Sequence, residues 1–177
     1  RSLSRRDLIT GGLGLGAAAL LGGCSTSGAG SPTPPVGTPP TPSLGAPAVR
    51  AVLRPGISRV DLGGITATTW CYDGVLPGTQ IRAKAGDVLQ VRVENSLPAE
   101  TSVHWHGIRL HNAADGVPGL TQAPIQPGGS FTYTFTAPDP GTYFFHPHSG
   151  VQIDRGLHAP LIIDDPAEPG GYDTEWV

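Results

Sequence analysis

Residues 87–95 read DVLQVRVEN and residues 130–137 read SFTYTFTA. In each stretch a large apolar residue stands at every second position, and successive side chains of a β-strand point to opposite faces. The apolar residues are Leu89, Val91 and Val93 in the first stretch and Phe131, Tyr133 and Phe135 in the second. Both stretches are therefore predicted to be strands with one buried face.

Five further short runs are rich in β-forming residues and are separated by turn residues, mainly Gly, Pro and Asp. They are ITATTWCY (65–72), TQIRAKA (79–85), SVHWHGIRL (102–110), GTYFFH (141–146) and APLIIDD (159–165). No helical periodicity competes with them. Short strands at this spacing predict an all-β fold, a Greek-key β-sandwich or barrel.

The composition agrees with a single β domain and excludes other classes. Only 14% of the 177 residues are charged, and 26 Gly and 19 Pro disfavour long helices and coiled coils. The net charge is -3 and no run of Lys or Arg is present. A nucleic-acid partner is therefore not expected.

The N-terminal segment has the pattern of an export signal. Arg5 and Arg6 precede an apolar run over residues 8–21, which at 14 residues is shorter than the roughly 20 that a membrane-spanning helix needs. The paired arginines resemble a twin-arginine signal, and LGGC, ending at Cys24, resembles a bacterial lipobox. Residues 1–24 are thus expected to direct export to the cell envelope, with a lipid on Cys24 as membrane anchor. The alternative is an ordinary signal peptide in which Cys24 is incidental.

Domain boundaries follow from the composition. Residues 25–48 consist almost entirely of Ser, Thr, Gly, Ala and Pro, which predicts a disordered linker. The folded domain is expected to span residues 49–166. Because the chain contains no Met and begins at Arg1, we expect the translation start to lie upstream of it. Residues 167–177 are expected to be the start of a following domain, since residues 172–177 resemble the beginning of such a domain's first strand.

Four of the six histidines form two His-x-His pairs, His104 with His106 and His146 with His148. In a strand, residues two apart share a face with Cα atoms about 7 Å apart, a spacing that suits neighbouring metal ions better than one ion. Two such pairs facing each other would supply four imidazole ligands to a multinuclear site. Imidazole favours copper, zinc, iron or nickel over calcium and magnesium. The alternative is that these histidines bind no metal.

Residues 59–166 closely resemble the first cupredoxin (plastocyanin-like) domain of the multicopper oxidases, the laccase-like copper enzymes. The motifs that carry the resemblance are Pro77-Gly78, Gly86-Asp87, Asn95-Ser96-Leu97, His104-Trp105-His106-Gly107, Asp115-Gly116-Val117-Pro118, Pro127-Gly128, Gly141-Thr142-Tyr143 and His146-x-His148. The resemblance implies an oxidoreductase that couples one-electron oxidation of a substrate to reduction of dioxygen to water at a trinuclear copper cluster.

The resemblance also implies roles for single residues. His104 is expected to be a ligand of the type 2 copper, and His106, His146 and His148 are expected to be ligands of the type 3 coppers. The other ligands and the type 1 copper would come from a later cupredoxin domain of the same polypeptide, so this chain alone is expected to be inactive. Asp115 stands where the family has an acidic residue that helps deliver protons, although an Asp-Gly turn would explain it equally well.

Several nearby residues are expected to have no part in the chemistry. Cys71 is expected to be a buried small hydrophobe, and Trp105 to pack in the core. His111 and His158 are expected not to be ligands. Pro147 departs from the family pattern and removes one backbone N–H between the two ligands of the second pair.

Two other functions stay open at this point. One is a copper-binding cupredoxin-like module without catalysis, which holds if the product ends near Val177. The other is a stand-alone copper or zinc β-sandwich enzyme of superoxide dismutase type. Within the oxidase hypothesis, the electron donor is a phenol, a cuprous or other metal ion, or another one-electron donor.

Overall fold

The computed structural model describes residues 42–176 of the chain. The expected signal segment with Cys24 and most of the linker lie outside these residues. Within residues 42–176 the structure contains nine strands and one short 3-10 helix, η1 (Asn112–Ala114). In this part of the chain, no helix combines the length and apolar character that a membrane crossing requires.

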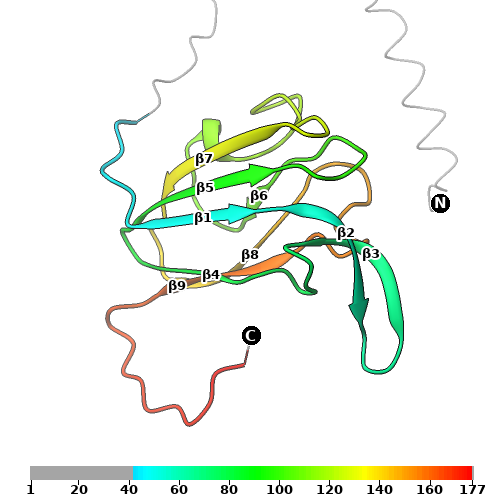
Figure 1. Ribbon diagram of the computed structural model, residues 1–177. Coiled ribbons are helices and arrows are strands. Elements are labelled where there is room, and N and C mark those ends of the chain that lie inside the picture. Colours follow the sequence, from blue (N-terminus) through cyan, green and yellow to red (C-terminus); the bar gives the residue numbers. More distant parts are fainter. Residues whose placement is uncertain (1–41, 177) are drawn as a thin grey trace, which may run out of the picture. The chain divides into compact units, whose positions relative to one another are not determined.

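Three strands form the first sheet, in the order β1 (Val49–Leu53), β5 (Val88–Glu94) and β7 (Ser130–Thr136). β1 runs parallel to β5, and β5 runs antiparallel to β7. The three strands lie side by side in Figure 1. The apolar residues at every second position of β5 and the last two of those in β7 are buried, as the sequence pattern predicts.

Four strands form the second sheet, in the order β4 (Ile81–Lys84), β9 (Ala159–Asp164), β8 (Gly141–His146) and β6 (His104–His106). β9 is parallel to β4 and antiparallel to β8, which is antiparallel to β6. The remaining strands, β2 (Pro55–Asp61) and β3 (Thr66–Tyr72), form an antiparallel hairpin that leads away from both sheets in Figure 1.

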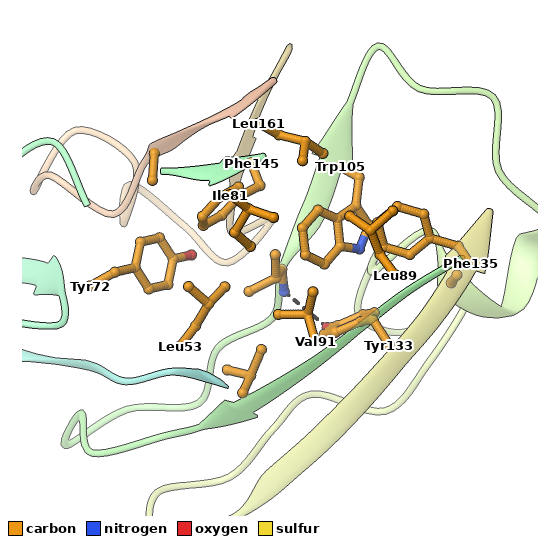
Figure 2. Packing of buried hydrophobic residues seen from close by; sticks show 14 of the residues in the cluster. Leu53, Tyr72, Ile81, Leu89, Val91, Trp105, Tyr133, Phe135, Phe145 and Leu161 are labelled. Atoms are coloured by element: carbon orange, nitrogen blue, oxygen red, sulfur yellow. Dashed lines mark hydrogen bonds between the residues drawn. The ribbon is translucent and has the colours of Figure 1, made fainter. Parts of the chain in front are cut away.

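The core lies between the two larger sheets. Trp105 of β6 is fully buried, and its ring lies 4.7 Å from that of Phe135 in the first sheet and 5.4 Å from that of Phe145 in the second. Figure 2 shows these rings packed with Leu89 and Leu161. The sheets are separate and do not close into one cylinder. Of the two predicted forms, sandwich and barrel, the fold is therefore the sandwich. Trp105 is confirmed as a core residue.

Cys71 is also confirmed as a core residue. Its side chain is fully buried and forms no disulfide with any residue that the structure describes.

Strand boundaries differ from the sequence prediction in two places. The run predicted over residues 102–110 is a strand only from His104 to His106, because Gly107 has a left-handed φ of 86° that turns the chain. β1 and β2 were not predicted as separate strands. β2 contains Pro55 and Gly56, which read as turn residues.

Residues 165–176 contain no strand. That residues 167–177 begin a following domain therefore stays a prediction.

The side chain of Asn95 stabilises the turn that follows β5 by three hydrogen bonds. Its side-chain amide donates to the carbonyl oxygens of Ala99 and Ile125, both at 2.9 Å, and its Oδ1 accepts from the N–H of Leu97 at 3.0 Å. The residue is buried. It thereby joins the end of β5 to the segment before β7.

We expect Asn95→Ala to lower the free energy of unfolding by about 2 to 4 kcal/mol, because it leaves the buried N–H of Leu97 and the half-buried carbonyl oxygen of Ala99 without their partner. Urea denaturation measures this loss. Ser96→Ala is the matched control, since Ser96 is exposed, and should change stability by less than about 0.5 kcal/mol. Equal stability of the two variants would contradict the assigned role of Asn95.

Candidate metal centre

The pairing of β6 with β8 brings the two His-x-His pairs together. In this antiparallel register His104 lies opposite His146, and His106 lies opposite Phe144. Side chains alternate across the sheet, so these residues share the face opposite to the core residues Trp105 and Phe145. His148 lies two residues after the end of β8. The two pairs, which are 42 residues apart in sequence, thus form one cluster of four imidazoles.

Ring nitrogens of three of these residues lie within metal-binding reach of one another. One nitrogen each from His104, His146 and His148 falls within 4.8 Å of the others. His106 joins the cluster through His146, because its Nδ1 lies 3.1 Å from Nε2 of His146. At a metal–imidazole distance of about 2.0 Å, two nitrogens so spaced subtend about 100° at a common ion. One ion could therefore bind both His106 and His146, while His104, His146 and His148 form a second group of donors within reach of a common ion.

Backbone carbonyl groups orient two of the rings. Nδ1–H of His104 donates to the carbonyl oxygen of Asp115 at 2.8 Å, and Nδ1–H of His146 donates to that of Pro147 at 3.0 Å. Each bond fixes the tautomer in which Nε2 carries a lone pair. Such second contacts of metal-binding histidines are typical of metal sites.

The surroundings favour neutral imidazoles. Burial lowers the pKa of His146, and the neighbouring histidines lower it further against the opposing effect of the Pro147 carbonyl. Burial and then His104 lower the pKa of His148, while Asp115 acts in the opposite direction. Because a metal binds the neutral imidazole, both shifts favour metal binding at neutral pH.

Asp115 lies next to His104, as the proton-delivery hypothesis requires. It follows η1, and its Oδ1 is 3.4 Å from Nδ1 of His104 with the side chain 35% exposed. The carboxylate therefore reaches both the histidine cluster and solvent.

Gly116 allows the loop that contains Asp115 to lie close to Val103, the residue before β6. Its φ is 79°, and an added Cβ would lie 1.8 Å from the carbonyl oxygen of Val103. On the other side, Val103 N–H donates to the phenolic oxygen of buried Tyr133 at 3.0 Å. Burial raises the pKa of Tyr133 to about 12, so the phenol stays neutral. The residue before His104 is thus held from two directions.

The segments that flank the two pairs are also joined. The N–H of His148 donates to the hydroxyl of buried Ser102 at 3.2 Å. Thr101 donates to the side-chain oxygen of Gln152 at 2.7 Å. Pro147 leaves the N–H of His148 in place, and this N–H is the group that makes the contact. The sequence analysis missed Ser102 and Gln152, since nothing local marks either residue as a neighbour of the second pair.

The other two histidines lie apart from the cluster. His111 places Nε2 3.2 Å from the carbonyl oxygen of Thr134, and the carbonyl of His158 accepts from the N–H of Gly78. Neither belongs to the group of nitrogen donors within reach of a common ion in the described part of the chain.

Known proteins share this domain. The model of a family described as multicopper oxidase matches residues 57–168. Multicopper oxidase MmcO of Mycobacterium tuberculosis is 54% identical over 125 residues, which cover 71% of this chain and 25% of that protein. Copper resistance protein A of Pseudomonas syringae is 46% identical over 119 residues, covering 67% of this chain and 20% of that protein. The chain therefore spans no more than a quarter of the length of these two relatives.

Solved structures agree in both fold and sequence. A multi-copper oxidase from Pseudomonas thermotolerans superposes with a TM-score of 0.66 and 37% identity, over 72% of this chain and 32% of that chain. A laccase from Botrytis aclada gives a TM-score of 0.64 and 40% identity, over 70% of this chain and 24% of that chain.

We expect Gly116→Ala to destabilise the domain by more than about 3 kcal/mol, because the added methyl group would lie 1.8 Å from the backbone carbonyl oxygen of Val103 and the backbone would have to shift. Gly119→Ala is the matched control. Gly119 has nearly the same φ, 76°, but nothing within 4 Å of its added Cβ, so only about 1 to 2 kcal/mol of backbone strain is expected there. Chemical denaturation of both variants separates the contact from the strain. Similar losses would refute the contact.

Proposed function

The chain belongs to the multicopper oxidase family, and we propose that it is the first cupredoxin domain of an oxidase that couples one-electron oxidation of a substrate to reduction of dioxygen to water. The observation that carries the proposal is the convergence of four imidazoles on one face of β6 and β8, with Nδ1 of His106 3.1 Å from Nε2 of His146. Membership of the family sets aside the superoxide dismutase-type alternative, and nothing specific favours a non-catalytic module.

We assign His104 to the type 2 copper and His106, His146 and His148 to the type 3 coppers. The contact between His106 and His146 supports a shared ion for these two residues. The four nitrogen donors suit copper, which has the highest place in the divalent affinity order. Copper bound there supplies the one-electron redox chemistry of the reaction. The remaining ligands and the type 1 site are assigned to a later cupredoxin domain of the same polypeptide.

The residues around the cluster have separate tasks in this proposal. The carbonyl oxygen of Asp115 keeps a proton on Nδ1 of His104 and so leaves Nε2 free to bind. The partly exposed carboxylate of Asp115 accepts protons from solvent and passes them toward the cluster through water. Gly116 and Ser102 hold the backbone on which His104 and His148 stand.

The location and the partners are part of the proposal as well. The paired Arg5 and Arg6 and the LGGC sequence ending at Cys24 support export to the cell envelope and a lipid anchor. The partners are dioxygen and an electron donor, which is a phenol-like small molecule or a metal ion.

The ligand assignment is tested by replacing His104 and His106 together with Ala in the full-length protein. We expect a lower copper content after loading with copper, because each imidazole supplies one nitrogen donor, together with loss of dioxygen consumption. Metal analysis by mass spectrometry and an oxygen electrode measure the two effects.

Two histidines outside the cluster serve as matched controls. His111→Ala and His158→Ala should keep the copper content and the dioxygen consumption of the wild type. An unchanged copper content in the double variant of His104 and His106 would falsify the assignment.

The role of Asp115 is tested by Asp115→Asn, which keeps the carbonyl contact with His104 and the side-chain shape but removes the titrating group. We expect the turnover number to fall by roughly 100-fold, a loss typical of a missing proton-transfer group, with the copper content unchanged. Steady-state dioxygen consumption measures the fall. Full turnover in Asp115→Asn would leave only the Asp-Gly turn as the role of this residue.

A further inference from the structure

Phe144 is a large apolar residue on the face of β8 that the core does not use. The residue is 36% exposed, whereas the next residue, Phe145, is fully buried and packs against Trp105. Alternation along the strand puts Phe144 on the side of His146. Core packing therefore does not account for an aromatic residue at this position.

The ring of Phe144 lies flat against two of the four imidazoles. Its centroid is 4.6 Å from that of His106, with 25° between the planes, and 5.2 Å from that of His146, with 22° between the planes. Register explains the first contact, because Phe144 is the direct cross-strand partner of His106. One side chain thus stacks on both rings.

Of the two imidazoles that Phe144 contacts, that of His106 depends on the contact more. A backbone carbonyl group orients the ring of His146. Among the described residues, the hydrogen bonds of the His106 ring are limited to the one with His146. A half-turn about its Cβ–Cγ bond would replace Nδ1 with a carbon atom and remove the nitrogen from the cluster.

We propose that Phe144 is a positioning residue that holds the imidazole of His106 with Nδ1 facing His146, and so sets the geometry and the retention time of the copper ion between them. The flat face of the ring performs this task, and bulk alone does not. The inference rests on the proposed function, since it takes His106 and His146 to be copper ligands.

The test uses the copper-loaded full-length protein and measures release of copper to excess EDTA together with the near-ultraviolet absorption spectrum of the bound copper, because a coupled pair of type 3 Cu(II) ions gives no electron paramagnetic resonance signal. Phe144→Leu keeps an apolar side chain of similar size without a flat ring. We expect it to release copper from the cluster about 10-fold faster, in the range seen when residues supporting metal ligands are changed, and to alter the spectrum. Phe144→Trp keeps a flat ring, so it should release copper at a rate within about 3-fold of the wild type and leave the spectrum unchanged.

Thr142→Ala is the matched control, because Thr142 is exposed, lies two residues earlier on β8 and shares the face of Phe144. It should leave both copper release and the spectrum unchanged. Release from Phe144→Leu at the wild-type rate, or failure of Phe144→Trp to restore it, would overturn the inference.

The failure of this inference is distinguishable from that of the proposed function. If the double variant of His104 and His106 loses copper while the Phe144 variants behave like the wild type, only the positioning role is wrong. If that double variant keeps its copper, the ligand assignment itself is wrong.

Discussion

The antiparallel pairing of β6 with β8 is the constraint on which the site depends. Three residue pairs define it, with Trp105 opposite Phe145 at its centre and His104 opposite His146 beside it. A shift of one residue would turn every side chain to the other face, so that the imidazoles would enter the core and the indole would enter solvent. The buried aromatic pair therefore fixes the register, and the register places the histidines.

Long-range contacts then hold this short strand pair in place. β6 has only three residues, too few to define a geometry alone. The Asp115 loop reaches it through the close approach of Gly116 to Val103, and Ser102 ties its leading end to His148. Tyr133 adds a contact from the first sheet. Each contact fixes one histidine or its immediate neighbour, so the metal geometry is distributed over several loops.

Much of the fold follows from local sequence pattern, whereas the supports of the site do not. Alternation in residues 87–95 and 130–137 identifies β5 and β7, and the two His-x-His pairs identify the imidazoles, because a strand places residues two apart on one face. Ser102, Phe144 and Gln152 could not be found in this way. Their partners lie 38 to 51 residues away in sequence, and only the tertiary pairing reveals them. β6 ends at His106 because Gly107 adopts a left-handed φ. The apolar residues after Gly107 favour a longer strand, so the sequence pattern alone does not reveal this end.

The two faces of β6 and β8 have opposite requirements, and this explains why residue types alternate so sharply there. The inner face needs large rings that exclude water, since Trp105 and Phe145 bury most of their surface between the sheets. The outer face needs imidazoles that keep a lone pair available, so they must stay near solvent or next to an ion. Phe144 is a large apolar residue on that outer face. Its ring stacks on His106 and His146, so it has apolar contacts there although it lies outside the core. An ion bound by these imidazoles would in turn cross-link β6 and β8, so metal binding and strand pairing stabilise each other.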